Sequence, residues 1–306
     1  MIRNSRRNFI KKTGIGALGM SIIPNISLAK SKNIKQLTIL HTNDTHSHIQ
    51  PIKNGRNQGL GGMAQRSTII KNIRNEGNQV LLLDAGDIFQ GTPYFNFYGG
   101  ELEFRLMSKM GYDASTLGNH DFDNGINGLS KQLKFSKFPF IISNYDFTET
   151  ELNDRFLKYK VFNKSGIKVG VFGIGIELDS LVPKDLYGNT IYQDPILKAN
   201  YYSKLLKEEL KCDLVICLSH LGFDYREKKV SDKILASYSR NIDLIIGGHT
   251  HTFLNEPKLI SNLDDKIVQI VQVGWAGINI GRIDYFFDQK FSIKMCETNT
   301  ILVKNS

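Results

Sequence analysis

This sequence contains few features that would set it apart from ordinary globular proteins. Its 306 residues include no low-complexity tract, heptad pattern or internal repeat, which argues against coiled coils and solenoids. The composition, 41% hydrophobic and 23% charged, is that of an average folded domain. No linker-like stretch divides the chain, so we expect a single large domain after the first thirty residues.

Cysteine is also scarce. The chain has three cysteines, Cys212, Cys217 and Cys296, and an odd number leaves at least one free thiol in an oxidising compartment. Cys217 lies in an apolar run five residues after Cys212, so on one strand the two would face opposite sides. We expect buried, unpaired thiols; a disulfide between Cys296 and one of the others is the alternative.

Acidic residues are absent from positions 1–29, which carry five basic residues. Arg6 and Arg7 precede Phe9 and two lysines; a weakly apolar stretch, 14–23, and a small-x-small motif at Ser27-Leu28-Ala29 follow. This pattern resembles a twin-arginine export signal. The alternative is a basic tail before a short core helix, since the apolar stretch is too short to span a membrane. We predict an export signal at 1–29 and a periplasmic or other extracytoplasmic location.

The export signal changes how the net charge is interpreted. Without its five basic residues the formal charge falls from +9 to +4, which does not argue for a nucleic-acid partner. The segment has no cysteine that could carry a lipid, so we predict no stable membrane anchor. Whether cleavage follows Ala29 is left open by the sequence.

Five apolar, strand-like runs each end at side chains that can bind metal ions. The runs are 37–40, 80–83, 114–117, 214–218 and 244–246, and the side chains that follow them include Asp44 and His46, Asp87, Asn119 and His120, His220, and His249 and His251. In an α/β sheet, ligands bind beyond the carboxyl ends of the strands. Five such ends in one sheet would bring these side chains together, which predicts a two-metal site.

Further patterns predict the layers around this site. Apolar residues at helical spacing predict helices over 62–76 and 101–110, and Leu197, Tyr201 and Leu205 mark one face of another. A hairpin is predicted over 156–176, and the chain becomes β-rich again after residue 266. The late strands suggest a second sheet packed against the first. We therefore predict an α/β fold with two packed sheets and helices outside both.

Each motif alone has an ordinary structural interpretation. Asp44 and His46 share a face if the strand continues, but either of them, like Asp87, could cap a helix. A polar turn would account for 118–123, where His120 and Asp123 are three residues apart. His220 could be a structural histidine, and His249 with His251 could lie on a surface loop. Because five of the seven histidines follow strands in this way, these separate interpretations are hard to sustain together.

Read in order, these motifs resemble the calcineurin-like metallophosphoesterases. His41-Thr42-Asn43-Asp44-Thr45-His46 and Gly118-Asn119-His120-Asp121-Phe122-Asp123 are similar to the two signatures of the 5′-nucleotidase branch, and Gly86-Asp87 with Gln90-Gly91-Thr92-Pro93 matches it too. The branch often has Glu at the position of Asp121, a change that keeps the charge. The resemblance covers nearly all of 30–306, which is therefore expected to be the catalytic domain. It implies the fold of that family, a four-layer α/β/β/α sandwich of two mixed sheets.

The resemblance implies a role for each site residue. The first metal would be held by Asp44, His46 and His251, the second by Asn119, His220 and His249, with Asp87 bridging and His120 with Asp123 as catalytic dyad. Such mixed ligands suit zinc, manganese or iron. We predict attack on phosphorus by a hydroxide shared by the two metals, assisted by His120.

Substrate recognition is the least determined part of the prediction. Members of this branch usually carry a second domain that binds the nucleoside, and this sequence ends before such a domain. The chain is therefore expected to work alone or with a separate chain that supplies nucleoside recognition. Tyr94, Phe95, Phe97 and Tyr98 either begin a buried helix, which we favour, or form a base-stacking surface. The preferred substrate is a phosphate monoester, in particular a nucleotide. Alternatives are cyclic-nucleotide, nucleotide-sugar or sulfur esters, or a non-catalytic metal-binding subunit.

Overall fold

The computed structural model describes residues 34–304. One compact unit, Lys35–Ser306, holds all the helices and strands given below. The predicted export signal lies outside the described residues, and the domain boundary after residue 29 stays a prediction. Within the described range, no helix is long and apolar enough to cross a bilayer.

The first sheet has five strands in the order β13-β12-β1-β2-β3. At its centre, β1 (Lys35–Thr42) pairs parallel with β2 (Gln79–Asp84) and antiparallel with β12 (Asn279–Phe287). β2 pairs parallel with β3 (Ala114–Ser115), and β12 pairs antiparallel with β13 (Ile293–Leu302). The sheet is therefore mixed, and the carboxyl ends of β1, β2 and β3 lie at the same edge.

The second sheet has six strands and is also mixed. Its order is β10 (Lys258–Ser261), β11 (Ile267–Val271), β9 (Leu244–Ile246), β8 (Leu214–Ser219), β6 (Ile167–Ile174) and β5 (Tyr159–Lys164). The four inner strands are parallel to one another, and β10 and β5 pair antiparallel at the two edges. The predicted hairpin is present as β5 and β6. A separate small sheet pairs β4 (Tyr145–Asp146) with β7 (Ile191–Tyr192).

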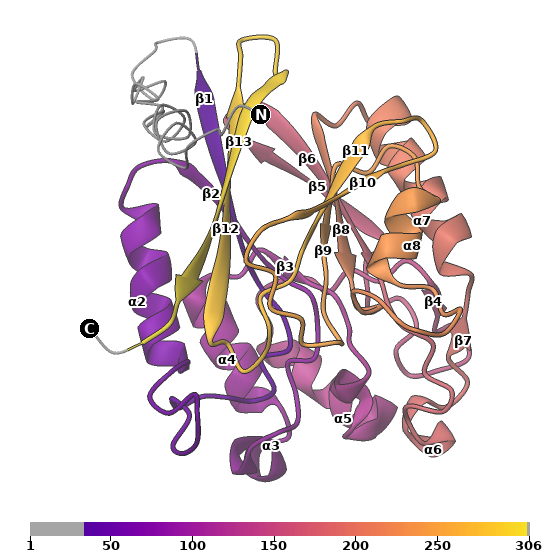
Figure 1. Ribbon diagram of the computed structural model, residues 1–306. Coiled ribbons are helices and arrows are strands. Elements are labelled where there is room, and N and C mark those ends of the chain that lie inside the picture. The colour runs from indigo at the N-terminus through magenta and orange to yellow at the C-terminus, as the bar shows by residue number, and fades with distance from the viewer. Residues whose placement is uncertain (1–33, 305–306) are drawn as a thin grey trace, which may run out of the picture. The chain divides into compact units, whose positions relative to one another are not determined.

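The two large sheets lie face to face (Figure 1). Alternate residues of their strands pack between them. Leu37 and Ile39 of β1 lie in the same buried cluster as Val169 of β6 and Ile216 of β8. Successive side chains of a strand point to opposite faces, so Leu40 lies in a different cluster, against the helices that cover the first sheet. This alternation produces the two inner layers of the sandwich.

Helices form the two outer layers. α2 (Met63–Arg74) and α4 (Glu101–Met110) cover the first sheet, and α7 (Pro195–Lys204) and α8 (Asp232–Ser237) cover the second (Figure 1). The remaining helices are α3 (Pro93–Tyr98), α5 (Gly125–Gln132), α6 (Lys184–Tyr187), the 3₁₀ turns η2 (His120–Phe122) and η3 (Leu133–Phe135), and the π-helical turn η4 (Leu205–Glu209). The predicted four-layer α/β/β/α fold is confirmed.

Two details of the prediction were wrong. The five strands that precede the ligand motifs do not share one sheet: β1, β2 and β3 belong to the first sheet, and β8 and β9 to the second. Helix α7 exists, but the apolar face predicted for it is turned outward, with Leu197 69% and Tyr201 63% exposed. The buried face of α7 carries the small residues Ala199 and Ser203 instead, because the helix lies close against the sheet.

The three cysteines are free. Cys212 and Cys217 are buried, as expected, but they lie in the same cluster between the second sheet and its helices. The expectation of opposite faces failed because Cys212 precedes β8 and does not belong to the strand. Cys296 is half-buried and pairs with neither.

Candidate metal centre

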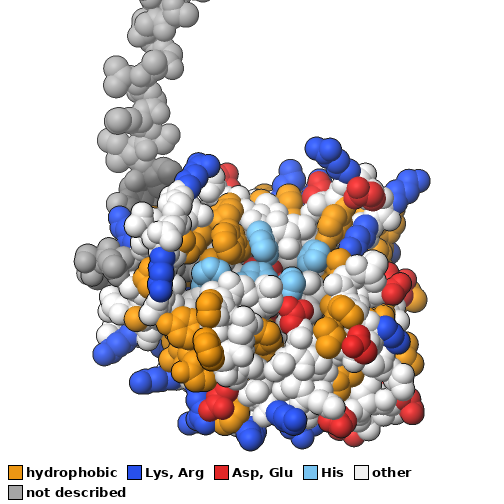
Figure 2. Space-filling model, turned by 90° about the horizontal axis from the view of Figure 1, so that it is seen from below, with side chains coloured by type: hydrophobic (Ala, Val, Ile, Leu, Met, Phe, Trp, Pro, Cys, Tyr) orange, Lys and Arg blue, Asp and Glu red, His pale blue; other side chains and the backbone are white. Residues whose placement is uncertain are grey.

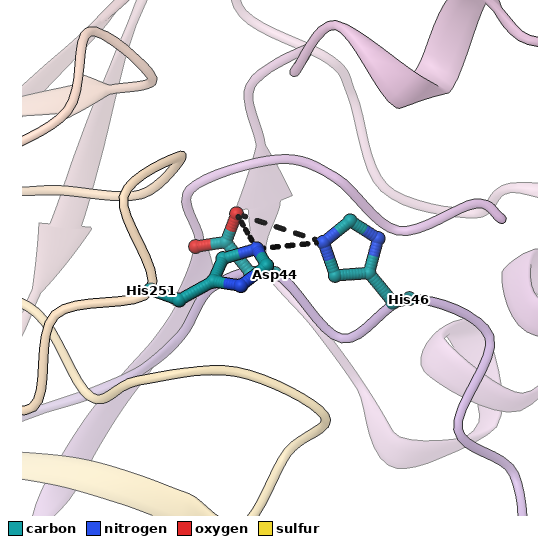
Figure 3. Close-up of side chains that lie close together, drawn as sticks. All are labelled: Asp44, His46 and His251. Atoms are coloured by element: carbon teal, nitrogen blue, oxygen red, sulfur yellow. Dashed lines mark hydrogen bonds and ion pairs between the residues drawn. The ribbon is translucent and has the colours of Figure 1, made fainter. Parts of the chain in front are cut away.

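Asp44, His46 and His251 form the first group of candidate metal ligands (Figure 3). Asp44 and His46 follow β1, and His251 follows β9. The Nε2 atoms of the two histidines lie 3.0 Å apart. Oδ1 of Asp44 lies 3.5 Å from Nε2 of His251 and 4.0 Å from Nε2 of His46. One carboxylate oxygen and two imidazole nitrogens therefore face the same small space.

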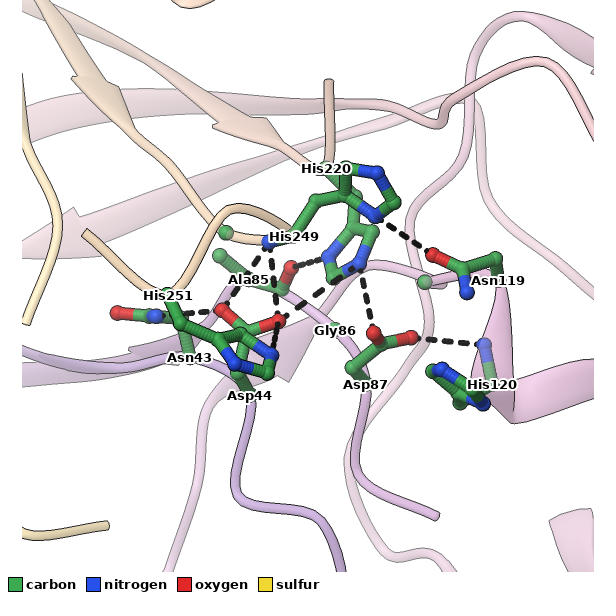
Figure 4. A network of polar contacts seen from close by, with 12 residues as sticks. Asn43, Asp44, Ala85, Gly86, Asp87, Asn119, His120, His220, His249 and His251 are labelled. Carbon is green, nitrogen blue, oxygen red and sulfur yellow. Dashed lines mark hydrogen bonds and ion pairs between the residues drawn. The ribbon is translucent and has the colours of Figure 1, made fainter. Parts of the chain in front are cut away.

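Asp87, His220 and His249 form the second group (Figure 4). They come from the ends of β2, β8 and β9. Oδ2 of Asp87 lies 3.1 Å from Nε2 of His220. Nδ1 of His249 lies 2.8 Å from Oδ1 of Asn119, so the amide oxygen borders the same space. All four side chains present nitrogen or oxygen atoms suited to a divalent cation.

The carboxylate of Asp87 lies between the two groups. Its Oδ2 is 3.8 Å from Nε2 of His46, in the first group, and 3.1 Å from Nε2 of His220, in the second. The structure thus brings together all seven predicted ligands at the edge where the two sheets meet. Which residue binds which ion stays a prediction.

Hydrogen bonds to the backbone fix the histidine rings. Nδ1 of His220 lies 2.7 Å from the carbonyl oxygen of Ala85, and Nδ1 of His46 lies 3.2 Å from that of Phe89. A ring that donates from Nδ1 directs its other nitrogen at the centre, which is the usual arrangement for a metal-binding histidine. Nε2 of His220 is buried and faces Oδ2 of Asp87, so both atoms are placed to contact a cation between them.

The electrostatics of the centre also favour cations. Burial raises the pKa of Asp44 to about 8. Burial acts on Asp87 in the same direction, but the nearby His220 and His46 lower its pKa overall. Burial lowers the pKa of His220, yet the facing carboxylates raise it to about 10. The site therefore attracts positive charge, and these residues fit two divalent cations.

Several of the same residues have strained backbone conformations. Five candidate ligands have left-handed backbone conformations, with φ of 49° at Asp44, 44° at His46, 56° at Asp87, 70° at His249 and 51° at His251. Such conformations cost about 1–3 kcal/mol each for residues other than glycine, and they cluster at functional sites. Here they turn each side chain from the end of its strand toward the centre.

His120 and Asp123 lie beside the centre as a pair. Nδ1 of His120 is 2.8 Å from Oδ2 of Asp123, and this hydrogen bond raises the pKa of His120. The His120 side chain is 37% exposed, and its ring centroid lies 5.3 Å from that of His46. Its backbone N–H donates to Oδ1 of Asp87, at 2.8 Å. An imidazole with a raised pKa is therefore placed at the open side of the candidate ligands.

Sequence reasoning missed the function of Asp121. This buried carboxylate accepts hydrogen bonds from four backbone N–H groups, those of Asp87, Ile88, Phe89 and Gly118. It therefore holds the loop after β2 against the loop after β3. The sequence did offer a signal. Asp121 is an acidic residue between two site residues, in a motif whose other polar residues were assigned as ligands or to the dyad.

Comparison with known proteins identifies the family of this chain. Residues 37–253 match the family model described as calcineurin-like phosphoesterase. The chain belongs to the calcineurin-like phosphoesterase family. The family and the two candidate metal sites confirm the sequence prediction of a metal-dependent phosphoester hydrolase.

Relatives of this phosphoesterase include animal and bacterial 5′-nucleotidases. It is 31% identical to the snake venom 5′-nucleotidase of Gloydius brevicauda, over 89% of this chain and 48% of that protein. Against human 5′-nucleotidase it is 31% identical, over 89% and 50% of the two chains. The crystal structure of a 5′-nucleotidase precursor from Thermus thermophilus superposes with a TM-score of 0.77 at 30% identity, covering 88% and 55%. The chain thus spans about half the length of the curated relatives it matches.

Proposed function

We propose that this phosphoesterase hydrolyses phosphate monoesters of nucleosides, as its relatives' name, 5′-nucleotidase, describes. The observation that carries the proposal is the meeting of two ligand groups at Asp87, with His120 at their open side. A phosphoryl group placed there would face both groups and the imidazole at once.

Seven residues would hold the ions. Asp44, His46 and His251 are assigned to one cation, Asn119, His220 and His249 to the other, and Asp87 to both. Two divalent cations held in this way lower the pKa of water and clamp the oxygens of a phosphoryl group. Zinc, manganese and iron all suit this mixture of imidazole, carboxylate and amide ligands.

His120 and Asp123 have a separate role in the proposal. Because Asp123 raises the pKa of His120, the imidazole is more readily charged. A charged imidazole can donate to a phosphoryl oxygen or give a proton to the leaving oxygen. Asp123 orients the ring and stabilises its charge from the side away from the ligands.

The test is to purify the chain, count its metals and assay a substrate panel with added Mn²⁺ or Zn²⁺. The panel contains a nucleoside 5′-monophosphate, a cyclic nucleotide, a nucleotide sugar, a sulfur ester and an aryl phosphate. We expect two metal ions per chain and preference for the monophosphate. Preference for another ester would replace the substrate assignment. Two bound metals without hydrolysis of any phosphoester would identify a non-catalytic subunit.

Export and partnership are also proposals. The twin-arginine pattern leads us to propose translocation of the folded chain, which Arg6→Lys with Arg7→Lys should block, leaving the protein in the cytoplasm. Unchanged export of this double variant would exclude the route. We also propose that a separate chain contributes to nucleoside recognition; this sequence matches about half the length of the relatives.

A further inference from the structure

Helix α3 carries aromatic side chains on two faces. Phe95 is 8% exposed and packs against Phe89, with ring centroids 5.2 Å apart. Phe97 is 83% exposed and Tyr98 is 53% exposed. Tyr94, Phe97 and Tyr98 stand at helical positions i, i+3 and i+4, so they share a face. The buried helix expected for this segment is therefore correct for Phe95 but not for the outer aromatic face.

The outer face of α3 borders a pocket of about 820 Å³. Its lining includes His48, Pro51, Lys53, Tyr94, Phe97 and Tyr98. The volume lies in the range of small-molecule sites. The lining contains Lys53 and no carboxylate, which favours ligands that carry negative charge. Hydrophobic side chains appear on the same face as the histidines in Figure 2.

The pocket shares two loops, those after β1 and β2, with the candidate metal centre. His46, a candidate ligand, and His48, in the pocket wall, are two residues apart. Thr92, at the start of α3, donates from Oγ1 to the carbonyl oxygen of Ser47 at 2.8 Å. A Cβ added at Gly91 would lie 2.8 Å from the backbone oxygen of His46. These contacts hold the aromatic face of α3 at a fixed place beside His46.

Trp275 also connects the two sites. Its ring stacks on that of His251, at 5.9 Å between centroids and 11° between planes. It meets the His48 ring edge to face at 5.3 Å. Because Trp275 is the only tryptophan of the chain, its fluorescence reports on this one place.

We propose that this pocket binds the nucleobase of the substrate while its phosphate lies at the metal centre. The inference rests on the proposed function and gives this chain a base-binding surface of its own. Every nucleobase has a flat π face, and such faces stack on exposed aromatic side chains. An aromatic ring left 83% exposed beside a hydrolytic centre is suited to this use, and burying it against a base removes apolar surface from water.

The first experiment compares two substrates that differ only in the base, adenosine 5′-monophosphate and ribose 5-phosphate. In Phe97→Ala we expect the kcat/KM for adenosine 5′-monophosphate, divided by that for ribose 5-phosphate, to fall roughly 5- to 100-fold, chiefly because KM for the nucleotide rises. This is the range that loss of one stacking ring produces. The matched control is Tyr201→Ala, an aromatic residue of α7 that is 63% exposed, which should leave the ratio unchanged. An unchanged ratio in Phe97→Ala would overturn the proposal.

The second experiment does not depend on catalysis. Free adenosine is titrated into the wild-type protein, with Trp275 fluorescence and calorimetry as readouts. We expect saturable binding that weakens at least 5-fold in Phe97→Ala and persists in Tyr201→Ala. Binding without hydrolysis of any phosphoester would contradict the proposed function and support the pocket. If neither readout detects adenosine binding, the proposed base-binding pocket is overturned. The same holds if the wild-type protein is a dimer that Phe97→Ala converts to a monomer while the substrate ratio stays unchanged.

Discussion

The backbone N–H of Asp87 donates a 3.1 Å hydrogen bond to Oδ2 of Asp121. Through the same carboxylate, Asp121 also binds the N–H groups of Gly118, Ile88 and Phe89. Asp121 is fully buried, so these backbone groups have no access to water as an alternative partner. The position of the central carboxylate, Asp87, is thus set by a residue that is not itself a candidate ligand.

Replacing Asp121 by Asn should therefore destabilise the protein and reduce its metal content. One amide nitrogen would take the place of a carboxylate oxygen and leave two backbone N–H groups unpaired, at a cost of about 2–5 kcal/mol in the free energy of unfolding. Urea unfolding and metal analysis measure the two effects. The control is Asp123→Asn, two residues later and 26% exposed, which should change unfolding little. Equal stability of the two variants would contradict the role given to Asp121.

His120→Ala should lower kcat by roughly 10²–10⁴ and leave the bound metal unchanged. The reason is that the imidazole lies beside the candidate ligands, and the hydrogen bond from His120 to Asp87 is donated by the backbone N–H, which the substitution keeps. Steady-state kinetics and metal analysis on the same preparation separate the two effects. Full activity in the variant would show that the pair of His120 and Asp123 is not catalytic.

Asp87→Ala should empty both metal sites. Its carboxylate lies within 3.8 Å of the nearest histidine nitrogen in each group, so its loss removes a ligand from both. Elemental analysis after dialysis against dilute metal provides the measurement. Asp185→Ala, which removes an exposed carboxylate from α6, is the control and should retain the wild-type metal content. Two remaining equivalents in Asp87→Ala would exclude the bridging position.

Chelation should lower the thermal stability of the wild-type protein. Without cations, two buried carboxylates and several imidazoles face one another with incomplete compensation. Metal at 100 times its dissociation constant would stabilise the folded state by about 2.7 kcal/mol. Thermal unfolding with and without chelator measures the difference. The same chelator should have no effect on Asp87→Ala, and an equal shift in both proteins would point to a metal site elsewhere.

The pH dependence of stability should reveal Asp232. Burial raises the pKa of this side chain to about 7, from its ordinary value of 3.8. Between these two values the unfolded chain has lost the proton that the folded chain retains, so the contribution of Asp232 to stability falls as pH rises and is constant above pH 7. Asp232→Asn has no such dependence. It keeps an oxygen that can accept from the Ser219 hydroxyl, as Asp232 does.

Relative to wild type, Asp232→Asn should therefore gain stability between pH 5 and pH 8. The gain corresponds to about two pKa units, or roughly 2–3 kcal/mol. Urea unfolding of both proteins at the two pH values is the measurement. A stability difference that is the same at both, or that changes in the opposite direction, would show that Asp232 is ionised in the folded protein.

Local sequence patterns predicted much of this fold because they report on local structure. Helix α4 begins and ends at the predicted residues, and the five apolar runs were located correctly, since strand ends followed by polar motifs are visible in a single segment. The division into two sheets was not visible there. It depends on pairings such as Lys35 with Phe287, which bring together distant parts of the chain and leave no local mark.

The candidate site was likewise predictable only where its residues form a local pattern. The candidate metal ligands were predicted from residue type and spacing, and the structure brings all of them together. Asp121 was missed because its partners are backbone groups, which every residue has and no motif displays. The exposure of Phe97 was missed because an aromatic pattern does not say which face of a short helix the rest of the protein covers.

The candidate ligands come from both sheets, and this has a consequence for how the protein matures. The backbone N–H of His249 donates to Asp44 although the two residues are 205 positions apart. Ions bound between such distant segments would act as cross-links that close very long loops, and their binding energy becomes folding energy. The centre exists only once both sheets have formed and met. Metal occupancy would therefore report that folding is complete, which is the state that the proposed twin-arginine route would require.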